Sequence, residues 1–178
     1  MADISGKKIL IISNEAFEKS ELFYPKSNLQ DAGATVHVAS SEMGEIRSME
    51  HLDWSDPVEV DKTFADVDVS DYDALVIPGG VANPDSMRVD EKAVAIVKAF
   101  NSAGKPVAAI CHAPWMLVEA DIVNGKTVTS YPTVRTDLKN AGGKVVDQEV
   151  AVDGNLITSR NPDDLPAFTS AIVKAIGG

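Results

Sequence analysis

The chain of 178 residues has the length of one globular domain, which can bury a core without disulfides or metal ions. Its composition is ordinary for such a domain, with 44% hydrophobic and 24% charged residues. A net charge of −11 counts against nucleic-acid binding, because contact with the phosphate backbone requires Lys and Arg. We therefore expect a single domain over residues 1–178.

The N-terminal segment and the cysteine content predict the compartment. The apolar run at residues 9–12 is too short for a signal peptide or a membrane span. A single cysteine excludes an intramolecular disulfide and a zinc site built from several cysteines, and it fits a reducing compartment. We expect a cytoplasmic protein with no membrane partner, no metal and no organic cofactor.

Short apolar runs alternate with helical patterns along most of the chain. Unbroken apolar runs of this length are typical of parallel strands covered on both faces, and they occur at 8–12, 35–39, 73–77 and 106–110. Helical patterns end at Gly33 and cover 90–103, 134–141 and 165–176, and another helix is expected to begin near His112. The alternation predicts a mainly parallel sheet with helices on both faces.

Other segments are less regular. Residues 127–129 read as a further strand, and Asp153-Gly154 predicts a hairpin between 150–152 and 156–158, because both turn residues tolerate positive φ. Residues 41–72 give only a turn near 43–45 and an edge strand near 58–60, and they are otherwise left unassigned.

Cys111 is the strongest candidate for a reactive residue. It follows the apolar run 106–110, and ligands in such folds bind outside the carboxyl ends of the strands. A nucleophile elbow needs small residues two positions before and after the nucleophile, and Ala109 and Ala113 occupy these positions. A helix N-terminus also stabilises a thiolate, so we expect an acidic, reactive thiol and not merely a buried one.

Residues after the other strands are candidate partners of Cys111. Gly79 and Gly80 follow the run 73–77, and their amides would suit an oxyanion hole. Glu15, Glu18 and Glu21 crowd the loop after the first strand, and one of them, held partly protonated, would donate a hydrogen bond to the sulfur. His112 is the only credible base, although its adjacency to Cys111 makes a simple facing pair awkward.

Several motifs together resemble those of PfpI-type proteins, in the superfamily that includes the Parkinson-associated protein deglycase. They run in family order from about residue 7 to 176, and they are Phe17-Glu18-Lys19-Ser20-Glu21-Leu22, Val76-Ile77-Pro78-Gly79-Gly80, Ala109-Ile110-Cys111-His112-Ala113-Pro114-Trp115, Thr129-Ser130-Tyr131-Pro132 and the segment 153–160. The resemblance implies a three-layer, flavodoxin-like α/β sandwich, as in class I glutamine amidotransferases.

The resemblance also implies roles for individual residues. Cys111 is the nucleophile, Glu18 is the carboxyl that hydrogen-bonds it, and Tyr131 lines the pocket. Gly80 and His112 supply oxyanion amides. Peptidase members complete a triad with a glutamate from a neighbouring subunit, where this chain has Asp85, whose shorter side chain disfavours peptidase chemistry. We expect a homodimer or a larger homo-oligomer.

Three functions remain open on the sequence alone, all within a general stress-protection role. The first is a cofactor-independent glyoxalase or deglycase, in which Cys111 attacks dicarbonyls such as methylglyoxal or their protein adducts. The second is an oligomeric cysteine peptidase. The third is a non-enzymatic redox sensor, in which Cys111 is oxidised. We rank them in that order.

Overall fold

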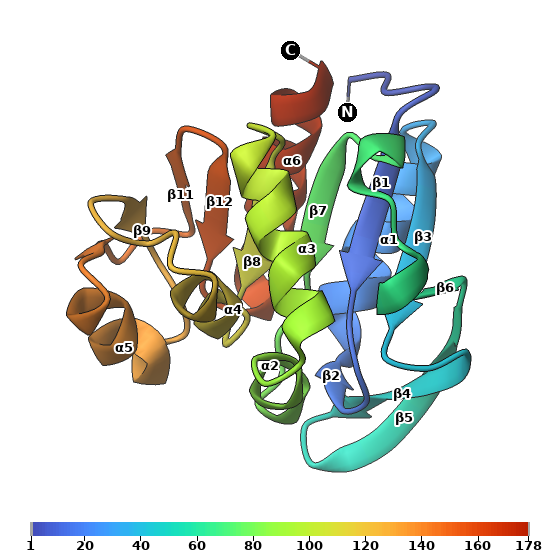
Figure 1. Cartoon of the computed structure of the whole chain (residues 1–178), viewed down its shortest axis with the longest axis horizontal. Helices are drawn as coiled ribbons and strands as arrows, with labels where there is room; N and C mark the ends of the chain where they lie inside the picture. Colours follow the sequence, from blue (N-terminus) through green and yellow to red (C-terminus); the bar gives the residue numbers. More distant parts are fainter. Residues whose placement is uncertain (1, 178) are drawn as a thin grey trace.

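The computed structural model describes residues 2–177, and its centre is a seven-stranded sheet with helices on both faces (Figure 1). The strand order is β11 (Val150–Asp153), β12 (Leu156–Ser159), β8 (Val107–Ile110), β7 (Ala74–Ile77), β1 (Lys8–Ile12), β3 (Thr35–Ser40) and β6 (Lys62–Thr63). All neighbours pair in parallel except β11 and β12, which form the predicted hairpin. The predicted parallel α/β sheet is confirmed.

The strands alternate their side chains between two apolar layers. Leu10 and Ile12 of β1 belong to a core on one face, and Ile9 and Ile11 belong to a core on the other. The first core includes residues of α2 (Ala82–Met87), α3 (Glu91–Ser102), α4 (Pro114–Glu119) and α5 (Arg135–Asn140), and the second includes residues of α1 (Lys19–Asp31) and α6 (Leu165–Gly177). Unbroken apolar strands are therefore buried because helices cover both faces.

Two small sheets lie beside the main one. Residues 41–72 contain a hairpin of β4 (Gly44–Glu50) and β5 (Asp53–Val60), and β4 pairs with β2 (Phe17–Glu18). The edge strand expected near 58–60 is the end of β5, which lies at the edge of this sheet. The strand expected at 127–129 is β9 (Thr127–Val128), which does not join the main sheet and pairs instead with β10 (Lys144–Val145). Short 3₁₀ turns cover Phe64–Asp66, Val69–Asp71, Pro132–Val134 and Pro162–Asp164.

Helix boundaries agree with the sequence patterns in most places. The helix α1 ends before Gly33, whose φ of +99° lies in the left-handed region that favours glycine. The helix expected to begin near His112 begins instead at Pro114, because the residues before it form a turn. No helix in residues 2–177 is long and apolar enough to cross a membrane.

Candidate active site

Cys111 lies at a sharp turn between the central strand β8 and α4. Its φ of +64° lies in the left-handed region, which a residue with a Cβ rarely adopts, and its N–H donates to the Ser159 carbonyl at 3.1 Å. Ala109 and Ala113, on either side, are fully buried, so larger side chains would not fit there. The predicted nucleophile elbow is therefore present.

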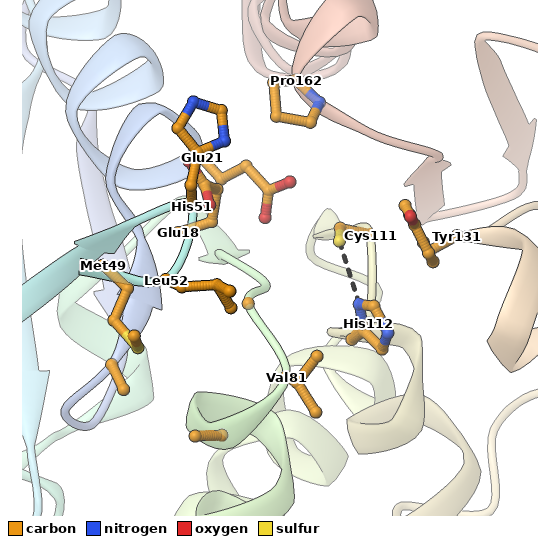
Figure 2. Close-up of a pocket in the computed structure, with 13 residues that line it drawn as sticks. Glu18, Glu21, Met49, His51, Leu52, Val81, Cys111, His112, Tyr131 and Pro162 are labelled. Atoms are coloured by element: carbon orange, nitrogen blue, oxygen red, sulfur yellow. Dashed lines mark hydrogen bonds between the residues drawn. The ribbon is translucent and has the colours of Figure 1, made fainter.

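The thiol opens into a cavity of about 350 Å³ at the carboxyl ends of the strands. Its lining combines a few polar groups with mainly apolar walls, and Figure 2 shows these side chains converging from α1, the β4–β5 hairpin, the loop after β7 and the elbow. The lining residues are Ala16, Glu18, Glu21, Met49, His51, Leu52, Gly80, Val81, Ala82, Cys111, His112, Tyr131 and Pro162.

His112 contacts the thiol directly, despite being the next residue in the chain. Its Nδ1 lies 3.1 Å from the Cys111 sulfur, and its Nε2 lies 3.1 Å from the hydroxyl of Thr133. The ring stacks on Tyr131 with a centroid distance of 4.7 Å. Burial lowers the pKa of His112, so the ring is neutral at neutral pH and its Nδ1 can accept a proton from the sulfur.

The carboxyl group that approaches the thiol belongs to Glu21, not to Glu18 as expected. Glu21 is fully buried, its Oε2 accepts from the Gly79 N–H at 2.8 Å, and its carboxyl points toward Cys111 (Figure 2). Burial raises the pKa of Glu21 to about 8, so this group holds a proton at neutral pH. Glu18 lies three residues earlier and also lines the cavity.

The thiol is less acidic than the sequence predicts. Cys111 is 7% exposed, and burial, followed by the neighbouring Glu21 carboxyl, raises the pKa of the Cys111 thiol. The amides of Gly80 and His112 oppose this increase. A helix N-terminus cannot compensate, since α4 begins only at Pro114. Attack by the sulfur therefore requires an adjacent base, and the neutral His112 occupies that position.

The two glycines after β7 have different contacts. The Gly79 amide is occupied by Glu21, so the expectation that it joins an oxyanion hole is wrong, whereas the Gly80 amide faces the sulfur. Gly80 has a φ of +76°, and a Cβ there would lie 2.8 Å from the Ala16 carbonyl oxygen and from the Glu18 nitrogen. Only glycine fits this close approach of two loops.

Of the two remaining predicted residues, one lines the cavity and the other does not. Tyr131 lines it and its N–H donates to the Cys111 carbonyl at 2.9 Å. Asp85 is exposed on α2 and does not line the cavity. The expectation that a second copy brings Asp85 to His112 stays a prediction, and within the chain the outer nitrogen of His112 already contacts Thr133.

Four residues of this site were not assigned a role from the sequence. Glu21 was one of three candidate glutamates after the first strand, but the family resemblance assigned the role to Glu18. Thr133 gave no signal. His51 and Leu52 fell in the segment left unassigned, and they reach the cavity from the tip of the β4–β5 hairpin. Among residues 2–177, no three His, Cys, Asp or Glu side chains cluster as a metal site would require.

The chain is similar to known proteins over nearly its full length. The model of the DJ-1/PfpI family matches residues 7–175. The protein named Deglycase TK1284, from Thermococcus kodakarensis, is 45% identical over 169 residues, which cover 95% of this chain and 99% of that protein. The protein named Putative cysteine protease YraA, from Bacillus subtilis, is 43% identical over 163 residues, which cover 92% and 94% of the two chains.

A solved structure confirms the likeness of the fold. The two-domain protein from Anabaena variabilis, described as containing DJ-1/ThiJ/PfpI-like and ferritin-like domains, superposes with a TM-score of 0.91 at 38% identity. The match covers 96% of this chain and 48% of that one. The family model, the relatives and the fold agree with the motifs quoted from the sequence, and the chain therefore belongs to the DJ-1/PfpI family.

Proposed function

We propose that the protein is a cofactor-independent glyoxalase or deglycase that acts on small dicarbonyls such as methylglyoxal or on their adducts. The observation that carries the proposal is the placement of Cys111 between two neutral proton carriers, His112 and Glu21, in a small and mainly apolar cavity. A similar relative is named a deglycase. Removal of reactive carbonyls is the stress-protection role expected from the sequence.

The first step is attack of the sulfur on the aldehyde carbon. The Nδ1 of His112, 3.1 Å from the sulfur, takes the thiol proton as the carbon–sulfur bond forms. In this tautomer the Nε2–H of His112 donates a hydrogen bond to the Thr133 hydroxyl, which lies 3.1 Å from Nε2. The developing alkoxide receives the proton of the Glu21 carboxyl, and the Gly80 and His112 amides stabilise its charge. The product of this step is a hemithioacetal.

The next steps move two protons and then add water. Glu21, now a carboxylate, takes the proton from the hemithioacetal carbon and gives it to the ketone oxygen, which forms an enediol. It then takes the hydroxyl proton from the first oxygen and gives it to the second carbon, which leaves a thioester of lactate on Cys111. Water attacks the thioester and gives one proton to the Glu21 carboxylate, the acyl–sulfur bond breaks, and the sulfur recovers its proton from His112. The sum is methylglyoxal plus water giving lactate, so no oxidant and no metal ion is consumed.

The environment of His112 supports peptidase chemistry less well than it supports dicarbonyl chemistry. Peptide hydrolysis needs an imidazolium that protonates the amine leaving group, and a carboxylate normally orients and stabilises that ring. Here burial lowers the pKa of His112 and its outer nitrogen contacts the neutral Thr133. A relative is nevertheless named a putative cysteine protease, so the experiment must offer both substrates.

Purified wild type and Cys111→Ala should be given methylglyoxal and a fluorogenic peptide in parallel. We expect lactate formation by the wild type alone, and peptide cleavage at the level of the Cys111→Ala control. Asp85→Ala should retain lactate formation, since Asp85 lies outside the cavity. Peptide cleavage that depends on both Cys111 and Asp85, with no lactate formed, would make the peptidase the correct reading.

A further inference from the structure

Glu18 places a carboxyl group at the wall of the Cys111 cavity without an ion-pair partner. It is half-buried, and its only side-chain hydrogen bond in the described part of the chain joins Oε1 to the Ser20 hydroxyl at 3.5 Å. The adjacent Lys19 is directed elsewhere, since its Nζ lies 3.1 Å from Glu50 and 3.0 Å from Asp56. The charge of Glu18 is therefore not neutralised by a neighbouring cation.

The cavity has little else to balance that charge. Among the described residues that line it, none is Lys or Arg, and the two charges that act on Glu18, those of His51 and Glu50, have opposite effects on its pKa. Glu21 is protonated at neutral pH because burial raises its pKa to about 8. Met49, Leu52 and Val81 add apolar side chains to the wall of the cavity (Figure 2). Low-dielectric walls strengthen the field of a single charge inside a cleft.

We propose that Glu18 selects substrates by charge. The cavity favours carbonyl compounds with a positive charge near the electrophilic carbon, and it disfavours anionic 2-oxoaldehydes such as 4,5-dioxopentanoate. The substrate preference rests on the proposed attack of Cys111 on carbonyl carbons. The selection by charge does not, because it acts on any reagent that approaches the sulfur.

Charged thiol reagents test the selection without any turnover. Cys111 is the only cysteine, so its modification is read directly from the intact mass. The reagents are two methanethiosulfonates of similar size, one with a trimethylammonium group and one with a sulfonate, and the neutral methyl compound reports thiol reactivity. For each protein, the rate of Cys111 modification by the cationic reagent is divided by the rate for the anionic reagent. This ratio for wild type is then divided by the ratio for Glu18→Gln, which cancels differences in the intrinsic reactivity of the reagents.

The matched control is Glu45→Gln, which removes an exposed carboxylate of β4 outside the cavity and corrects for the net charge of −11. We expect the divided ratio to be about 10 for Glu18→Gln and about 1 for Glu45→Gln at low salt. Glu18→Met, which also removes the charge while retaining the volume, should agree with Glu18→Gln. A value near 1 for the folded Glu18 variants, or equal values for Glu18→Gln and Glu45→Gln, would overturn the selection by charge.

A turnover arm separates this inference from the proposed function. Glu18→Gln should raise kcat/KM for 4,5-dioxopentanoate, a 2-oxoaldehyde that carries a carboxylate and would be converted to 2-hydroxyglutarate, about tenfold relative to methylglyoxal. If the labelling ratios change as expected but neither aldehyde is turned over, the proposed function fails and the selection by charge stands. If both aldehydes are turned over with an unchanged preference and the labelling ratios are also unchanged, the selection by charge fails alone.

Discussion

Replacing Glu21 by Gln is expected to lower methylglyoxal turnover at least about 100-fold while making the folded protein more stable at pH 8. The loss follows because an amide cannot release and recover a proton, and a positioned proton carrier typically contributes a factor of 10² or more. Gln still offers an oxygen to the Gly79 N–H, so the hydrogen bond at 2.8 Å can be kept. The fold should therefore survive the change.

The gain in stability follows from the pKa of Glu21. Its folded-state pKa is about 8 against 4.5 for a free glutamate, so the stability that this group contributes is fully present below pH 4.5 and is lost as the pH rises to 8. The shift corresponds to at most about 5 kcal/mol in the free energy of unfolding. Gln does not titrate, so this cost disappears.

Thermal unfolding at pH 5 and pH 8 measures the effect. The excess in Tm of Glu21→Gln over wild type should be several degrees larger at pH 8 than at pH 5. Glu15→Gln serves as the control, because its carboxyl lies outside the cavity and accepts from the Arg47 N–H. An excess in Tm that is independent of pH would show that Glu21 is ionised in the folded protein, and the proposed proton transfer would be wrong.

Gly80→Ala is expected to destabilise the protein by roughly 3 kcal/mol or more. Two costs add: alanine at φ +76° costs about 1–2 kcal/mol, and its Cβ would lie 2.8 Å from two backbone atoms of the loop after β1. Gly125→Ala is a matched control, since Gly125 has the same φ of +76° but no atom within 4 Å of the added Cβ.

Both variants carry the same backbone strain, so the difference between their Tm values reports the cost of the close contact at Gly80. Gly80→Ala should unfold roughly 6–12 °C below wild type, and Gly125→Ala only a few degrees below it. Equal losses would mean that the close packing of the Gly80 loop against Ala16 and Glu18 contributes nothing. A folded Gly80→Ala protein should also react more slowly at Cys111, because the Gly80 amide that faces the sulfur is displaced.

The sheet could be predicted from the sequence because its strands are buried on both faces. Residues 8–12 and 106–110 are unbroken apolar runs, and only a central parallel strand accommodates such a run. The β4–β5 hairpin could not, since it is mostly exposed and carries charged residues on both sides, so that its alternation is weak. The start of α4 was misplaced even though Pro114 stands at its first position, where proline is favoured.

The site was predicted where it depends on local sequence and missed where it depends on packing. Cys111 and its alanine neighbours specify the elbow within a few residues. Glu18 and Glu21 both lie near the start of α1 and both line the cavity, and which of them reaches the sulfur depends on how α1 packs against the sheet. The contact of Thr133 with His112 also joins distant segments, and no short motif records it.

Rapid-quench mass spectrometry of wild type and Cys111→Ala tests most directly whether the Cys111 sulfur bonds to the carbonyl carbon. Both proteins are mixed with methylglyoxal, quenched in acid within one turnover, digested and mapped. We predict a transient mass gain of one methylglyoxal on the peptide containing Cys111 in the wild type, which decays as lactate appears, and no such gain in Cys111→Ala. Lactate formation without any adduct at Cys111, or at the same rate in Cys111→Ala, would contradict the proposed mechanism.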